Sequence, residues 1–144
     1  FCGSGAVFLE GISSFPYKYA YAYDADINKI KLLEKKVTWT REKVKIQVGD
    51  ALNLSEIEEG SVDKIVTDPP WGHYEKLEDV GDFYKRMIDE FGRVLKPSGI
   101  LVILVAREIG FEELVVTTTK FKFIEKYEIL VFGKKASIFK FIRS

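Results

Sequence analysis

The sequence contains few of the residues on which several classes of protein depend. It has one cysteine, Cys2, and one histidine, His73, so it lacks both the cysteine pairs of a disulfide framework and a set of zinc ligands. Its 22 basic and 22 acidic residues leave no net charge, which argues against a protein that binds nucleic acid through phosphate neutralisation alone. The longest apolar stretch, residues 100–106, is too short to cross a bilayer. We therefore expect a cytoplasmic domain with no membrane partner.

The sequence does contain ample material for a packed core. Hydrophobic residues make up 47% of it and aromatic residues 14%, which argues against intrinsic disorder. Its 144 residues fit one domain and are too few for two sizeable cores. We expect residues 1–144 to form a single domain.

Helical and strand patterns alternate along the chain. The expected helices lie within 3–15, from 26 to 37, from 82 to 94, and within 108–118. Asp26 and Asp82 are the expected caps of the second and third helices, and the third has apolar residues at helical spacing, namely Phe83, Met87, Phe91 and Val94. The expected strands are 19–23, 44–48, 62–67 and 100–106, followed by a hairpin of 121–132 and 137–142 that turns at 133–135. Alternating strands and helices favour a mostly parallel sheet covered by helices. The predicted fold class is α/β, doubly wound, with a C-terminal antiparallel hairpin.

Residues suited to ligand binding stand where four strands would end. Residues 2–5, Cys-Gly-Ser-Gly, form a glycine turn of the kind that normally follows a strand. Asp24, Asp50 and Asp68 come directly after the next three expected strands. Because ligands bind beyond the carboxyl ends of parallel strands, these residues predict a binding crevice.

The glycine turn and Asp24 favour a nucleoside ligand. Gly3 and Gly5 would let the backbone approach a ligand and would present amides at a helix start. Asp24 lies 19 residues after Gly5, a spacing at which a carboxylate can accept both hydroxyls of a ribose. Taken alone, each feature fits an ordinary turn or a helix-cap aspartate equally well. Phe8 stands where a dinucleotide fingerprint has its third glycine, which favours an adenosyl ligand over a nicotinamide cofactor.

The segment Asp68-Pro69-Pro70-Trp71 is the most informative part of the chain. Two consecutive prolines remove two amide donors, so their carbonyls can face a ligand beside the Asp68 carboxylate. Such a cluster of acceptors suits an exocyclic NH₂ group, and Trp71 offers a face on which a base can stack. The alternative is a Pro-Pro turn with a packing tryptophan.

These motifs resemble class I S-adenosylmethionine-dependent methyltransferases. The similarity is greatest to the RNA methylase family that often carries an N-terminal THUMP domain and makes N2-methylguanosine in tRNA or rRNA. It rests on five segments in order, namely 1–5 (Phe-Cys-Gly-Ser-Gly), Asp24, 49–51 (Gly-Asp-Ala), 68–72 (Asp-Pro-Pro-Trp-Gly) and 93–99 (Arg-Val-Leu-Lys-Pro-Ser-Gly). The motif at Asp68 is shared with adenine-N6 methylases, so it identifies the reaction better than the substrate.

The resemblance implies a Rossmann-like fold and a role for each matching residue. The S-adenosylmethionine site would comprise Phe1, Cys2, Gly3, Gly5, Asp24, Ala25, Asp50, Ala51 and Asp68. Within it, Cys2 and the two glycines would line the methionine part, Asp24 would bind the ribose, and Asp50 with Ala51 would contact the adenine. The catalytic segment would be Asp68, Pro69, Pro70 and Trp71, with Asp68 and the Pro69 carbonyl holding the target amino group and Trp71 stacking on the base. Cys2 and His73 are expected to pack in a turn and to lie in a loop, respectively, rather than to act as nucleophile and base.

Several alternatives stay open at this stage. An adenine-N6 methylase of DNA or RNA would use the same chemistry, and a non-catalytic subunit that binds nucleosides could keep the same fold. In the family's sheet, the strand that would precede Phe1 lies at the centre, so we expect the chain to be a fragment that lacks its first strand. Residues 120–144 carry seven basic and two acidic side chains, which fits either an RNA-facing patch or a solvated hairpin. Because the domain is not basic overall, we expect an additional RNA-binding domain or subunit to help hold a tRNA or rRNA substrate.

Overall fold

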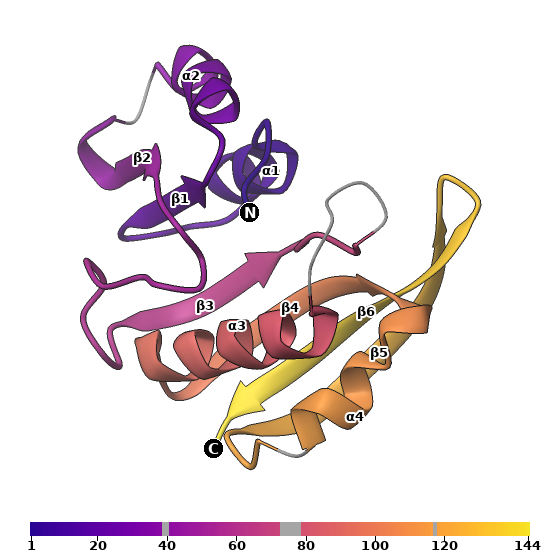
Figure 1. Ribbon diagram of the computed structural model, residues 1–144. Helices are drawn as coiled ribbons and strands as arrows, with labels where there is room; N and C mark the ends of the chain where they lie inside the picture. The colour runs from indigo at the N-terminus through magenta and orange to yellow at the C-terminus, as the bar shows by residue number, and fades with distance from the viewer. Residues whose placement is uncertain (39–40, 73–78, 117) are drawn as a thin grey trace. The chain divides into compact units, whose positions relative to one another are not determined.

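The computed structural model describes residues 1–38, 41–72, 79–116 and 118–144 (Figure 1). These residues form two compact units, Phe1–Asn53 and Leu54–Ser144, and each is described by itself. His73 lies outside the described residues. Within the described ranges, no helix is both long enough and apolar enough to cross a membrane.

The first unit is a pair of parallel strands with two helices. Its elements are α1 (Ala6–Ser14), β1 (Ala20–Asp24), α2 (Ile27–Lys36), the 3-10 helix η1 (Arg41–Lys43) and β2 (Val44–Val48). β1 pairs with β2 in parallel, from Ala20 opposite Val44 to Asp24 opposite Val48. Asp24 and the residues that follow Val48 therefore lie at the same end of this sheet.

The core of the first unit fixes the helices to the strands. Ala22 of β1 and Leu33 of α2 are fully buried in it, together with Val37. The predicted cap of α2 is confirmed, because the Asp26 carboxylate accepts a hydrogen bond from the Asn28 amide at 2.8 Å.

The second unit contains the sheet β3-β4-β6-β5. Its elements are β3 (Val62–Thr67), α3 (Val80–Val94), β4 (Leu95–Ala106), the 3-10 helix η2 (Arg107–Ile109), α4 (Phe111–Val116), β5 (Phe121–Val131) and β6 (Lys134–Arg143). β3 and β4 are parallel, whereas β6 runs antiparallel to both β4 and β5. This topology confirms the predicted α/β class with a C-terminal antiparallel hairpin.

Two strands of the second unit, β4 and β6, begin earlier than the sequence predicted. β4 begins at Leu95 instead of residue 100, because Leu95 already pairs with Val62 before the register shifts. The hairpin turns at Phe132 and Gly133, with Val131 paired to Lys134, so β6 begins three residues earlier than expected. The early start of β4 arises from pairing with β3, which is distant in the sequence and which local composition does not report.

Helix α3 begins earlier than predicted, and of its expected apolar face Met87, Phe91 and Val94 are buried whereas Phe83 is not. The cap is Asp79, whose carboxylate accepts from the Asp82 amide at 2.9 Å, so the assignment of Asp82 as the cap was wrong. Asp82 lies in the first turn, where an acidic side chain complements the helix dipole. The buried residues lie along one face of the helix, namely Tyr84, Met87, Ile88, Phe91, Gly92 and Val94.

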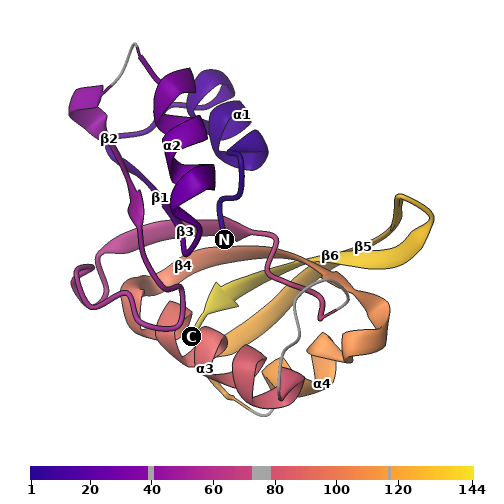
Figure 2. The same cartoon turned by 45° about the horizontal axis from the view of Figure 1, so that its top comes forward.

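An aromatic cluster joins the helices to the sheet of the second unit. α3 and α4 lie on the same face of that sheet (Figures 1 and 2). The ring of Phe111 on α4 lies 5.6 Å from that of Tyr84, 5.7 Å from that of Phe139 and 6.0 Å from that of Phe141, measured between centroids. This packing fixes Tyr84 beside the segment that follows β3.

Candidate active site

The glycine turn of the first unit is built around the Asp24 carboxylate. The Gly3 amide donates to Asp24 Oδ2 at 2.7 Å, and the Asp26 amide donates to Oδ1 at 3.0 Å. Asp24 is only 7% exposed, so these bonds satisfy a buried charge at the end of β1. Each oxygen of a carboxylate accepts more than one hydrogen bond, so Asp24 keeps acceptor capacity toward a ligand.

The two glycines of this turn adopt conformations that side chains disfavour. Gly3 and Gly5 have φ angles of +56° and +90°. A Cβ atom at Gly5 would lie 2.3 Å from the Leu33 Cδ1 atom, whereas a Cβ atom at Gly3 would meet open space. Gly5 therefore permits close packing on α2, and Gly3 leaves its backbone accessible beside Asp24.

Backbone hydrogen bonds tie the predicted cofactor residues to one end of the first unit's sheet. The nitrogens of Phe1 and Cys2 each donate to the Tyr23 carbonyl at 2.8 Å. The amide of Gly49 donates to the Asp24 carbonyl at 3.0 Å, which holds the start of the 49–51 segment beside Asp24. The structure thus brings the glycine turn, Asp24 and the 49–51 segment together, as the sequence predicted.

The remaining predicted residues of this unit differ in exposure. Ala25 and Asp50 are exposed, whereas Ala51 is buried. Asp50 accepts a hydrogen bond from the Leu52 amide at 2.8 Å, which orients its carboxylate within a tight turn. Cys2 packs against the apolar core, and this burial raises the pKa of its thiol. A thiol of raised pKa is a poor nucleophile, in agreement with the packing role expected for Cys2.

In the second unit, the Asp68 segment forms a compact turn after β3. The Trp71 indole Nε1–H donates to Asp68 Oδ1 at 3.0 Å, a bond within the motif itself. Partial burial raises the pKa of the Asp68 carboxyl, and the indole hydrogen bond opposes that rise. Asp68 is thus a carboxylate with one oxygen held in place and a basicity above the ordinary value.

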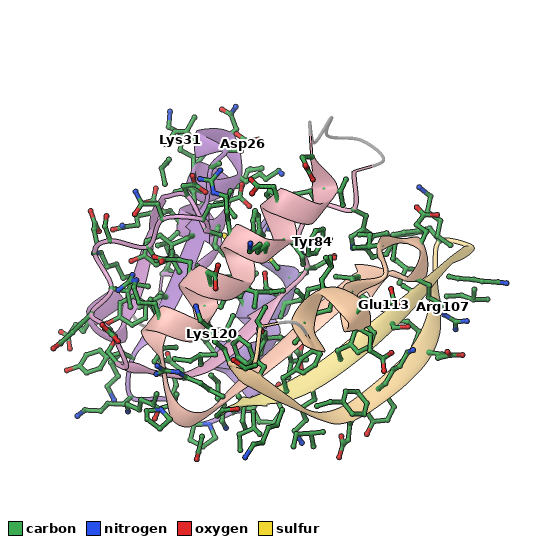
Figure 3. All side chains as sticks on the ribbon, turned by 60° about the horizontal axis from the view of Figure 1, so that its bottom comes forward. Asp26, Lys31, Tyr84, Arg107, Glu113 and Lys120 are labelled. Carbon is green, nitrogen blue, oxygen red and sulfur yellow. The ribbon has the colours of Figure 1, made fainter. Side chains whose placement is uncertain are left out.

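Tyr84 of α3 stabilises the same turn by a hydrogen bond to its backbone. Its hydroxyl donates to the Pro70 carbonyl at 2.9 Å, and its side chain is fully buried (Figure 3). Burial, reinforced by the nearby charge of Asp68, raises the pKa of Tyr84, so the hydroxyl keeps its proton and remains a donor. With the Pro70 carbonyl engaged by Tyr84, the Pro69 carbonyl is the backbone acceptor to consider beside Asp68.

Sequence reasoning missed the contribution of Tyr84. The apolar pattern of this helix placed Phe83 on its inner face, but Phe83 is partly exposed and Tyr84 is buried. The signal was the spacing of Tyr84 with Met87, Ile88 and Phe91, which puts a residue with a polar tip on the core face of the helix. Trp71 was expected only to stack on a base, and its hydrogen bond to Asp68 is an additional role.

Comparisons with known proteins agree with this arrangement. The model of the family described as "RMKL-like, methyltransferase domain" matches residues 1–131. The U6 snRNA (guanine-N(2))-methyltransferase THUMPD2 of Bos taurus is 29% identical over 109 residues, which cover 74% of this chain and 21% of that protein. The chain therefore spans about a fifth of the length of that relative.

Solved structures show the same fold at low sequence identity. TrmN from Thermus thermophilus superposes with a TM-score of 0.82 at 22% identity, covering 100% of this chain and 42% of that one. A SAM-dependent methyltransferase from Methanosarcina mazei gives a TM-score of 0.76 at 18% identity, covering 99% of this chain and 89% of that one. These matches confirm the predicted methyltransferase fold.

Proposed function

Since the chain belongs to the RMKL-like methyltransferase domain family, we propose that it transfers a methyl group from S-adenosylmethionine to an exocyclic amino nitrogen of a base in RNA, with guanine N2 as the target. The observation that carries this proposal is the acceptor cluster at the end of β3. Asp68 is held there by Trp71, and the adjoining turn is held by Tyr84. A guanine amino group, with two donor hydrogens, complements such acceptors.

The first unit has the residues to hold the cofactor. S-adenosylmethionine supplies a methyl group activated by its sulfonium charge. The accessible backbone at Gly3 fits the methionine part, together with Phe1, Cys2 and Gly5. Asp24, with Ala25 beside it, presents acceptors for the ribose hydroxyls, and Asp50 with Ala51 would contact the adenine.

The second unit has the residues to prepare the nucleophile. An aromatic amine is a poor nucleophile because its lone pair is delocalised into the ring. Hydrogen bonds from the amino group to Asp68 and to the Pro69 carbonyl would favour a pyramidal nitrogen and stabilise the positive charge that develops on it. After transfer, that nitrogen must lose a proton. The raised pKa of the Asp68 carboxyl suits it to accept this proton.

Two observations support RNA as the substrate and guanine as the base. The Bos taurus relative is named a guanine-N(2) methyltransferase of U6 snRNA, and its match spans 109 residues of the chain. The acceptor-only character of the Asp68 turn suits an amino group that donates two hydrogens. In folded RNA the target base must first be unstacked, and the Trp71 ring could offset part of that cost. Because the sequence carries no net charge, an additional RNA-binding domain or subunit would supply part of the affinity.

The proposal is tested by identifying the cofactor and the product with the full-length protein. Calorimetry should show binding of S-adenosylmethionine and no binding of a nicotinamide dinucleotide. Nucleosides from RNA treated with the protein and labelled cofactor should contain N2-methylguanosine by mass spectrometry. N6-methyladenosine as the product would overturn the guanine assignment, and preferential binding of the dinucleotide would overturn the reaction.

A further inference from the structure

The tip of the β5–β6 hairpin carries an aromatic side chain where turn chemistry disfavours one. Phe132 is fully exposed, and its φ angle is +48°, followed by +79° at Gly133. A two-residue turn with both φ angles positive normally takes asparagine, aspartate or glycine, and a bulky side chain at positive φ is strained. Neither packing nor turn geometry accounts for phenylalanine here. Strained residues that the rest of the fold maintains are candidates for function.

A cationic cavity adjoins the base of this tip. It has a volume of about 330 Å³ and is lined by Ala106, Arg107, Glu108, Lys134 and Lys135. Arg107, Lys134 and Lys135 are cationic and Glu108 is anionic, and because Arg107 pairs with Glu128, the exposed Lys135 is the cation that this lining offers to a phosphate. Arg107 donates through Nε to the Ala136 carbonyl at 3.4 Å and pairs with Glu128 at 3.0 Å, which fixes it against the hairpin (Figure 3).

The strand register places the β5–β6 hairpin tip and the adjoining cavity at the same end of the sheet as Asp68. Thr67, the last residue of β3, lies opposite Ile103 of the parallel β4. β4 continues to Ala106, which pairs with Ala136 near the start of β6. The hairpin tip therefore lies beyond the carboxyl ends of β3 and β4, where the Asp68 turn also begins (Figure 1). All of these elements belong to the second unit, and the family match ends at Val131, directly before Phe132.

We propose that this tip binds a single-stranded part of the RNA substrate, with Phe132 stacking on a base and Lys135 of the adjoining cavity contacting backbone phosphate. The proposal rests on the function proposed above, because it assigns a second contact to the same substrate. An exposed aromatic ring beside a cationic groove is the combination with which proteins bind single strands without reading their sequence. Phe132 would hold a nucleotide outside the acceptor cluster and so orient the RNA for methylation.

Substitutions of Phe132 distinguish an effect on protein stability from an effect on RNA binding. Phe132→Asn places a residue suited to positive φ before Gly133, so it should preserve or raise the thermal stability of the full-length protein. It should also weaken binding of a fluorescently labelled single-stranded RNA about tenfold. Phe132→Trp should restore that binding, because it restores a stacking face. Unchanged RNA affinity in the asparagine variant, as expected if the tip serves a protein partner instead, would overturn the proposal. A Phe132→Trp variant that is folded but does not restore RNA binding would also overturn the proposal.

The salt dependence of binding tests the phosphate contact. Lys135→Ala should reduce the slope of log affinity against log salt concentration by about 0.7, the value for one phosphate contact in a single strand. Lys122→Ala is the matched control, because Lys122 is also exposed but pairs opposite Ile142 at the other end of the hairpin. Equal slope changes in the two variants would contradict a specific site at the cavity.

These experiments also distinguish this proposal from the proposed function. RNA binding that depends on Phe132, in a protein that transfers no methyl group, would support the tip and overturn the enzymatic assignment. Conversely, RNA methylation with an unchanged KM for RNA in the Phe132→Asn variant would overturn the tip and leave the enzymatic assignment in place.

Discussion

The indole N–H of Trp71 donates a hydrogen bond to Asp68 Oδ1 at 3.0 Å, so two residues of one short turn share a defined geometry. The bond engages one carboxylate oxygen, and in the proposed function the other accepts from the amino group of the base. It also favours the ionised form of Asp68, against the effect of partial burial on the pKa of that carboxyl. Trp71 is thus positioned to act on the charge of Asp68 as well as on a stacked base.

Removing the indole donor should change the pH dependence of catalysis. Trp71→Phe keeps an aromatic face but loses the hydrogen bond that lowers the pKa of Asp68, so that pKa should rise further. In the proposed mechanism the ionised carboxylate of Asp68 is the active form, so activity should disappear at a higher pH in the variant as the solution is acidified. The measurement is kcat/KM against pH, whose acid limb reports the pKa of the free enzyme. An acid limb that does not move would show that Trp71 does not act on Asp68.

Loss of the Tyr84 hydroxyl should weaken the turn without disturbing cofactor binding. Tyr84→Phe leaves the Pro70 carbonyl without its donor, at a cost of about 1–2 kcal/mol in the free energy of unfolding. A misplaced Asp68 should then lower kcat about tenfold, with the Kd for S-adenosylmethionine unchanged. Tyr127→Phe is the matched control, because that exposed hydroxyl donates only to Glu125 on the surface. Equal effects of the two substitutions on kcat would remove the positioning role of Tyr84.

Gly5 of the glycine turn and Gly11 of α1 should respond in opposite ways to substitution by alanine. Gly5→Ala combines a positive φ with a clash against Leu33, so it should destabilise the fold by about 2 kcal/mol and weaken cofactor binding. Gly11 lies inside α1, and a Cβ there would meet nothing within 4 Å. Gly11→Ala should therefore stabilise the protein by up to about 1 kcal/mol. Chemical denaturation and calorimetry with S-adenosylmethionine measure both effects, and a harmless Gly5→Ala would contradict the close packing on Leu33.

Glu90 should make folding stability depend on pH. Its carboxylate accepts from Arg93 at 2.7 Å and from the Leu54 amide at 2.6 Å, and the Arg93 hydrogen bond is the main cause that lowers its pKa. A depressed folded pKa stabilises the protein above the unfolded value and loses that contribution as pH falls through the folded value. Glu90→Gln should therefore cost about 1–2 kcal/mol at neutral pH and progressively less below about pH 4.

Urea unfolding at several pH values tests this expectation. Asp63→Asn is the control, because its partner Lys96 and Asp63 itself form an exposed surface pair. That substitution should leave the unfolding midpoint almost unchanged at neutral pH. A Glu90→Gln penalty of constant size from neutral to acidic pH would contradict the assigned role of its charge.

The sequence allowed the prediction of features that follow from local chemistry or from a general rule of the fold. The cap at Asp26 and the turn after β3 follow from local chemistry, and the glycine turn beside Asp24 follows from the rule that the carboxyl ends of parallel strands share one edge; the structure shows all three. Tyr84 and the Glu90–Arg93 pair could not be recognised in this way, because their partners Pro70 and Leu54 are distant in sequence. The position of the hairpin turn was missed for a related reason. Phenylalanine is a poor residue for that turn, and the pairing of β6 with β4 and β5 overrides its preference.

The central claim is that Asp68 holds the amino group that is methylated, and one substitution tests it directly. With full-length protein, RNA and labelled S-adenosylmethionine, Asp68→Ala should lower the single-turnover rate of N2-methylguanosine formation by about 10²–10³-fold. Cofactor affinity should be retained, and the control Asp63→Ala, in the strand β3 that precedes Asp68, should keep full activity. An Asp68→Ala variant that forms N2-methylguanosine at the wild-type rate would contradict the account.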